Sequence, residues 1–131
     1  MMLVLDSSAM LAFLRDEEGA DVVQECLENN ACCAHALCFC EVHYIIRRSS
    51  GAEGADRAID LLDSYGVLLR DDMDTRTWKD ASAVKADYAP ISLADCFCAA
   101  LAKLVSGEVV TTDSDFAPLA EAGLCPVQFI R

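Results

Sequence analysis

The chain has 131 residues, enough for a substantial hydrophobic core, and we expect a single domain over residues 1–131. Apolar residues make up 54% of the sequence, which excludes an intrinsically disordered protein. The 10 basic and 22 acidic side chains give a net charge of −12, which excludes a diffuse basic surface as the main means of binding nucleic acid.

In the first half of the chain, short apolar strands alternate with helices. The pattern predicts a strand over 2–5, a helix that Ser7 or Ser8 caps and that ends near 14, and, after a polar break at 15–19, an amphipathic helix over 20–28. It then predicts a strand over 31–35, a mostly buried helix over 37–48, a loop at 49–51 and a further helix over 53–64.

The second half continues the alternation. The pattern predicts a strand over 66–69, a helix from 74 or 75 to about 88 that Pro90 ends, a helix over 92–105, a strand over 109–112, a short helix over 116–122 and a strand over 126–130. Strands this short and continuously apolar suit a parallel sheet that is covered on both faces. We therefore expect a three-layer α/β/α fold with a short, parallel, five-stranded sheet.

The sequence indicates neither an export signal nor a cysteine-based site. Residues 1–6 contain no basic segment and no apolar run reaches the ~18 residues of a membrane span, so we expect a soluble, cytoplasmic protein without a membrane partner. The eight cysteines lack C-x-x-C spacing, and neighbours such as Cys32 and Cys33 point to opposite faces of a strand. We expect reduced thiols in the core, with a cysteine-based metal or redox sensor as the alternative.

Two acidic side chains directly follow predicted strands. Asp6 ends the first strand, and Asp113 follows the strand at 109–112. The carboxyl ends of the strands form the ligand crevice of open parallel sheets, although each acid can equally serve as a helix N-cap. Asp115 either adds a further carboxylate or caps the helix that begins at Phe116.

Two further acids lie in apolar helices. Glu41 stands within 37–46 and Asp95 within 93–101, and neither has a Lys or Arg one turn away. A buried carboxylate costs several kcal/mol unless a cation or hydrogen-bond donors compensate it. A capping box, Ser92-x-x-Asp95, offers a structural reason for Asp95, whereas Glu41 has none. Together with the two strand-end acids, these carboxylates can converge on one hard cation such as Mg²⁺ or Mn²⁺.

Four segments of the chain, in this order, resemble the motifs of the PIN-domain family, and most closely its VapC-type toxins of bacterial and archaeal toxin–antitoxin pairs. The segments are Leu5-Asp6-Ser7-Ser8-Ala9, Glu41-Val42, Ser92-Leu93-Ala94-Asp95 and Val110-Thr111-Thr112-Asp113-Ser114-Asp115-Phe116. The resemblance covers nearly the whole chain.

The resemblance implies a Rossmann-like sheet of order 3-2-1-4-5 and a metal-dependent endoribonuclease that hydrolyses RNA by in-line attack of water, leaving 5′-phosphate and 3′-hydroxyl ends. By motif, Asp6, Glu41, Asp95 and Asp113 would form the catalytic quartet. Asp6, Asp95 and Asp113 would bind Mg²⁺, with Mn²⁺ as an alternative ion. Glu41 would orient a second ion or the attacking water.

Further polar residues and partners follow from the same resemblance. Ser8 and Thr112 match polar positions around the quartet, and Asp115 is a candidate fifth carboxylate. The family implies a homodimer that a VapB-like antitoxin holds inactive. Because the chain is acidic, contact with RNA would depend on local basic residues, for which the candidates are Arg47, Arg48, Arg76 and Lys79.

The main alternative is a catalytically silent PIN fold whose acidic pocket binds a basic peptide. The intact motifs favour the nuclease, but they do not identify the RNA that it cuts. We expect His35 and His43 to be structural, because this chemistry needs no imidazole base.

Overall fold

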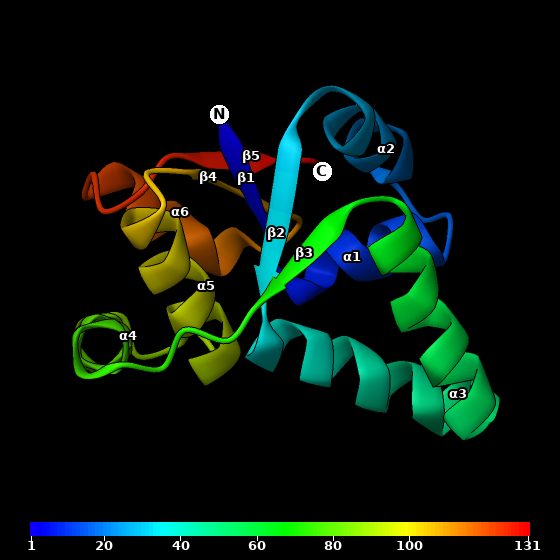
Figure 1. Cartoon of the computed structure of the whole chain (residues 1–131). Helices are drawn as coiled ribbons and strands as arrows, with labels where there is room; N and C mark the ends of the chain where they lie inside the picture. Colours follow the sequence, from blue (N-terminus) through cyan, green and yellow to red (C-terminus); the bar gives the residue numbers. More distant parts are fainter.

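A parallel five-stranded sheet forms the centre of the computed structural model, which describes residues 1–131 (Figure 1). Its strands are β1 (Met2–Leu5), β2 (Ala31–His35), β3 (Val67–Arg70), β4 (Glu108–Thr111) and β5 (Val127–Phe129). They lie in the order β3-β2-β1-β4-β5, and every neighbouring pair is parallel. The predicted fold class and strand order are therefore confirmed.

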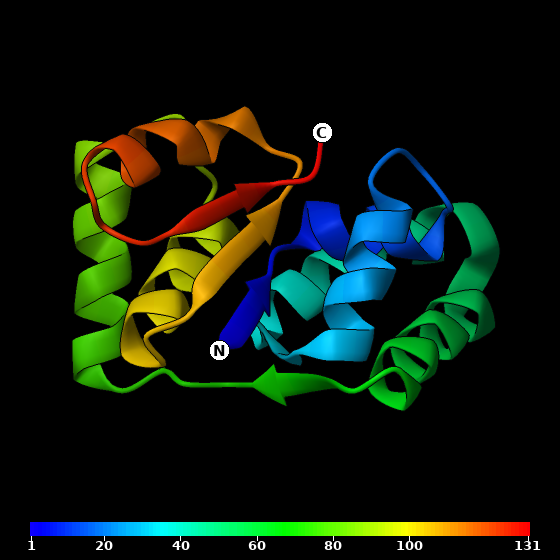
Figure 2. The same cartoon turned by 90° about the horizontal axis from the view of Figure 1, so that it is seen from above.

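Helices cover both faces of the sheet, because each connection between parallel strands crosses over one face (Figure 2). One layer contains α1 (Ser7–Leu14), α2 (Ala20–Asn29) and α3 (Ala36–Ser64), and the other contains α4 (Thr75–Asp87), α5 (Leu93–Leu104) and α6 (Ala117–Glu121). The chain moves from β1 to β3 in one direction and then returns to β4 and β5, so right-handed crossovers place the two sets of helices on opposite faces. None of the helices combines the length and the apolar composition needed to cross a bilayer.

The main departure from the predicted elements is in α3. We expected a loop at 49–51, but the helix continues through Ser50 and only Gly51 leaves helical geometry, with φ of 76° and ψ of 176°. This left-handed region is accessible to glycine, which has no Cβ, so the two helical segments meet at a kink rather than across a loop. The other predicted boundaries agree with the structure to within one or two residues.

The core lies between the sheet and its helices, and it contains nearly all the cysteines. Helix α5 packs across β1, β2 and β4, and its residues from Asp95 to Ala102 are all buried. No cysteine is in a disulfide, and every cysteine except Cys40 is buried. Burial raises the pKa of the Cys33 thiol to about 11, which keeps it protonated. The prediction that the cysteines are core residues is confirmed for all except Cys40.

Candidate active site

Asp6 and Asp113 are brought to the same edge of the sheet because β1 and β4 are parallel neighbours. In the pairing of the two strands, Leu5 lies opposite Val110, and the Asp6 backbone N–H donates to the Val110 carbonyl at 3.2 Å. Asp6 therefore leaves β1 at the level where β4 ends. The carboxyl ends of these two strands form the floor of the candidate site.

Asp6 is the N-cap of α1 and is only 1% exposed. Its Oδ1 accepts hydrogen bonds from the Ala9 backbone N–H at 2.9 Å and from the Ser8 hydroxyl at 2.7 Å. Of the caps that we considered for this helix, Ser7, Ser8 or the strand-end carboxylate, the structure shows the carboxylate, and this cap orients it. Burial raises the pKa of Asp6 to about 6, against the lowering effect of its hydrogen bonds from Thr111, Ser8 and Ala9.

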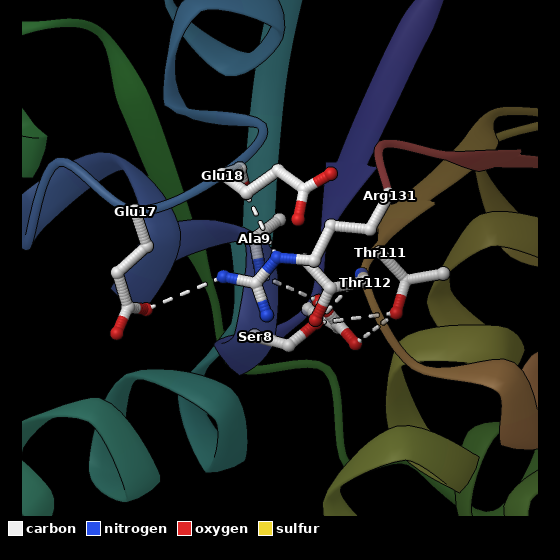
Figure 3. A network of polar contacts seen from close by, with 8 residues as sticks. Ser8, Ala9, Glu17, Glu18, Thr111, Thr112 and Arg131 are labelled. Carbon is white, nitrogen blue, oxygen red and sulfur yellow. Dashed lines mark hydrogen bonds and ion pairs between the residues drawn. The ribbon is translucent and has the colours of Figure 1, made fainter.

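Thr111 is a site residue that the sequence reasoning missed. Its hydroxyl donates to Asp6 Oδ2 at 2.5 Å and accepts from the Asp113 backbone N–H at 2.8 Å, so it links the two strand-end acids. Thr112 contributes its backbone N–H, which donates to the Ser8 hydroxyl at 2.9 Å (Figure 3). Successive side chains of a strand point to opposite faces, so only one of the two threonine hydroxyls can reach Asp6. The sequence contains this alternation but does not indicate which face holds the acid.

Asp95 lies in the first turn of α5, whose N-cap is Ser92. The Ser92 hydroxyl accepts from the Asp95 backbone N–H at 3.1 Å, as the capping-box spacing predicts. The Asp95 carboxylate is 5% exposed, and its Oδ1 is buried without any hydrogen-bond partner. This unpartnered carboxylate oxygen is the feature of the site that most needs an explanation, since buried polar atoms are nearly always satisfied.

The charges around Asp95 come from the other predicted site acids. Burial is the largest cause that raises its pKa to about 8, followed by the negative charges of Asp6, Asp113 and Glu41. The structure therefore brings the four carboxylates into electrostatic contact, although they come from two strand ends and two different helices. Their roles in catalysis or metal binding stay predictions.

Glu41 lies on α3 and reaches the site from the side of α1. The Ser7 hydroxyl donates a hydrogen bond to Glu41 Oε1, and this contact joins the start of α1 to α3. Ser7 is buried, whereas Glu41 is half-buried. Sequence reasoning treated Ser7 only as a possible helix cap, because its partner is distant in the chain.

Asp113 and Asp115 have different surroundings. Asp113 caps the 3-10 turn Ser114–Phe116, and its Oδ1 accepts from the Asp115 backbone N–H at 2.8 Å. Asp113 therefore has the N-cap role that we considered for it, whereas the cap that we considered for Asp115 is not formed. Asp115 instead lines a surface hollow beside Asp87, and its charge is not among the main influences on Asp6 or Asp95.

We call Asp6, Glu41, Asp95 and Asp113 the acidic cluster. Both histidines make structural contacts outside it. His35 is fully buried, its Nδ1 accepts from the Leu37 backbone N–H at 3.1 Å, and its Nε2 lies 2.8 Å from the Asp72 carbonyl. The Leu37 contact makes Nδ1 the acceptor, so Nε2 donates to Asp72. His43 pairs through Nε2 with Asp56 at 2.9 Å, which connects the two segments of α3.

The donor set fits a hard divalent cation. No three His, Cys, Asp or Glu side chains are grouped tightly enough to coordinate one ion together. However, Mg²⁺ keeps several waters and is commonly held by only one or two carboxylates. A cation beside Asp95 would satisfy its unpartnered Oδ1 and offset the repulsion among the acids.

Comparisons with known proteins agree with this fold. A family model described as PIN domain matches residues 3–122. The chain is similar in structure to VapBC2 from Rickettsia felis (TM-score 0.77, 14% identity, 100% of each chain covered) and to VapBC-1 from Haemophilus influenzae (TM-score 0.73, 18% identity, 98% of each chain covered). It is also similar to VapC20 from Mycobacterium tuberculosis, a sarcin-ricin loop cleaving toxin (TM-score 0.72, 14% identity, 89% of this chain and 94% of that chain covered). No curated protein matches the sequence at a significant level.

The structural likenesses, at these identities, concern the fold. The family model spans most of the chain, from β1 to the end of α6, and it includes the segments that carry Asp6, Glu41, Asp95 and Asp113. The chain belongs to the PIN domain family.

Proposed function

We propose that this protein is a metal-dependent endoribonuclease and the toxin of a VapBC-type toxin–antitoxin pair. The observation that carries the proposal is the Asp95 carboxylate, which is buried with an unpartnered oxygen and faces the charges of Asp6, Asp113 and Glu41. Such an arrangement is costly without a cation, and it is typical of a site that binds one. Membership of the PIN domain family and likeness in fold to VapC proteins support the choice of RNA as substrate.

Asp6 and Asp95 would hold Mg²⁺, or Mn²⁺ in its place, and Asp113 would help directly or through a bound water, since no three acids are grouped tightly enough to coordinate one ion together. When bound, such an ion lowers the pKa of water and neutralises charge on a phosphodiester. Ser8 and Thr111 hold the Asp6 carboxylate in one orientation by donating to its two oxygens. The chain therefore supplies a preorganised set of oxygen ligands at the sheet edge.

Glu41 would orient the attacking water, or a second ion that does so. Its Oε1 accepts from Ser7, which leaves the remaining lone pairs of the carboxylate available for a water proton. In-line attack by that water would produce 5′-phosphate and 3′-hydroxyl ends.

The partners proposed for this chain follow from its relatives. Several proteins of the same fold are described as VapBC complexes, which supports a VapB-like antitoxin as partner. We also propose a homodimer, as the family resemblance implies, and we propose that the protein acts in the cytoplasm.

The test is cleavage of end-labelled total RNA by antitoxin-free protein in Mg²⁺, in Mn²⁺ and in chelator. The Asp95→Asn variant removes one charge inside the cluster, and Asp63→Asn removes one exposed charge on α3 as the matched control. We expect discrete products that require metal, persist in Asp63→Asn and disappear in Asp95→Asn. Cleavage by both variants alike would contradict the site assignment.

A folded wild-type protein that cuts no RNA pool but binds a basic peptide would favour the alternative function. In that case the acidic pocket would be a binding site for Lys- or Arg-containing segments, and Asp95→Asn would weaken that binding instead. Metal dependence distinguishes the two functions, because RNA cleavage requires a divalent metal and binding of a basic peptide does not.

A further inference from the structure

A second candidate site is the hollow between the end of α1 and the kink of α3. It encloses about 370 Å³ and combines polar residues with an apolar floor. The polar side is Arg15, Arg57, Ser49 and Ser50, and the floor is Leu14, Ile46, Ala58 and Leu61. We call it the kink hollow, since the backbone change at Gly51 separates the two helical segments that border it.

The charge of the kink hollow is opposite to that of the protein. The chain has 22 acidic and 10 basic side chains, yet this hollow has two arginines and no carboxylate among its lining residues. Each of the other three main hollows includes acidic residues, namely Asp80 and Asp87, Glu25 and Glu108, or Asp87 and Asp115. The kink hollow is therefore the main hollow suited to an anion.

Neither arginine is engaged in a strong internal ion pair. Arg15 is exposed, and it makes no salt bridge or side-chain hydrogen bond in the structure. Arg57 lies 3.9 Å from Glu53, but the two side chains are 73% and 94% exposed, so the pair contributes little. Both guanidinium groups are free to bind a ligand. Two more arginines, Arg47 and Arg48, directly precede Ser49 and add positive charge nearby.

The kink hollow and the acidic cluster lie at opposite ends of the contact between α1 and α3, which we call the seam. Helix α1 begins beside Asp6 and ends at Leu14, and α3 runs beside it from Glu41 to Ile46. At 1.5 Å per residue, the seam is about 10 Å long. A single strand of RNA with one phosphate in the acidic cluster would reach the kink hollow a short distance along its backbone.

We propose that the kink hollow is a phosphate subsite for the RNA strand, outside the position that is cut. Arg15 and Arg57 bind backbone phosphates, and the apolar floor receives the face of a base. Arginine suits this task because its planar fork pairs with phosphate and stacks on bases. This inference rests on the proposed ribonuclease function. It adds to that function two residues, Arg15 and Arg57, through which an acidic protein can bind RNA.

The test measures the salt dependence of RNA binding. A short, labelled, mixed-sequence single-stranded RNA is titrated with Asp95→Asn protein, which binds without cutting, over a series of KCl concentrations in Mg²⁺. The probe variant adds Arg15→Ala and Arg57→Ala, and the control adds Lys85→Ala and Lys103→Ala on α4 and α5, across the sheet (Figure 2). Each lost phosphate contact lowers the slope of log K against log salt by about 0.7, so we expect a fall of about 1.4 for the probe variant.

The controls distinguish a local phosphate site from an effect of the total charge of the protein, and from an effect of misfolding, on the salt dependence. Arg15→Lys with Arg57→Lys keeps both charges and should restore the slope. An unchanged slope in the probe variant, or an equal fall in the control that lacks Lys85 and Lys103, would overturn the subsite. Binding of inorganic phosphate or of an acidic peptide at the hollow, without any change in the RNA slope, would also overturn it. Failure of the wild-type protein to bind or cut RNA at any salt concentration would instead refute the ribonuclease function as well.

Discussion

Replacing Asp95 by Asn should stabilise the metal-free protein at neutral pH while it removes the response to Mg²⁺. The carboxylate is 5% exposed, its Oδ1 has no partner, and the charges of Asp6, Asp113 and Glu41 act on it. Asn has nearly the same size and no charge. The substitution therefore tests the electrostatic cost of the site without changing its packing.

The magnitude follows from the pKa of Asp95, which rises from 3.8 to about 8 in the folded protein. A raised pKa means that the folded state holds the proton more tightly than the unfolded chain, so the associated stability is present below pH 4 and is lost as the pH rises toward 8. Between pH 3.8 and 7 this amounts to about 3 pH units at about 1.36 kcal/mol each, or about 4 kcal/mol. The amide of the Asp95→Asn variant cannot ionise, so the variant avoids this loss.

The assay is urea unfolding of wild type and Asp95→Asn in chelator, from about pH 4 to about pH 8. The free energy of unfolding of the variant should exceed that of wild type by an amount that grows by about 4 kcal/mol between about pH 4 and pH 7. Mg²⁺ at about 100 times its Kd should then stabilise wild type by about 2.7 kcal/mol and the variant much less.

A difference between the two proteins that stays constant with pH would refute the reasoning, because it would show that Asp95 titrates normally. An equal Mg²⁺ response in both proteins would refute its role as a ligand. The exposed control Asp63→Asn should follow wild type at every pH.

Two further substitutions probe the surroundings of the site, and a third probes the packing of the chain end against the start of α2. The Thr111 hydroxyl donates a hydrogen bond to Asp6 and lowers the pKa of that carboxyl. Thr111→Val removes this hydrogen bond, so the pH midpoint of Mg²⁺ binding should rise by about 1 unit, and Thr111→Ser should restore it. An unchanged midpoint would show that the contact has no role in metal binding. Glu41→Gln should reduce RNA cleavage about 100-fold or more while the Mg²⁺-induced rise in Tm remains, and loss of both would make Glu41 a ligand rather than a water-orienting group. Gly19 has a φ of +97°, and an added Cβ would lie 2.8 Å from the Ile130 carbonyl oxygen. Gly19→Ala should therefore lower the free energy of unfolding by about 1–3 kcal/mol in a urea titration. A neutral effect would show that the chain end moves freely.

The architecture was predictable because its signals are local. Apolar runs of four or five residues, each followed by a polar cap and an amphipathic stretch, predict alternating strands and helices, and this alternation implies a parallel sheet. The interruption of α3 was predicted near Gly51, but its form was not. A glycine can end a helix or kink it, and the contacts of the following segment decide between the two.

For the site, the sequence by itself determined which acids were out of place. Asp6 and Asp113 follow strands, and Glu41 and Asp95 lie in apolar helices without a basic neighbour, and these are properties of spacing and composition. The resemblance to the family motifs then assigned these four acids to one site. Neither the spacing of the acids nor the family motifs indicate which side chains hold the carboxylates in place.

The tertiary structure alone decided the hydrogen bonds and the charge environment. Thr111, rather than Thr112, reaches Asp6, and Ser7 binds Glu41 across 34 positions of sequence. The raised pKa of Asp95 depends on burial of α5 against the sheet and on acids from three other segments. Such contacts join residues that are distant in the chain, and both desolvation and charge interactions depend on distances that only the packed fold defines.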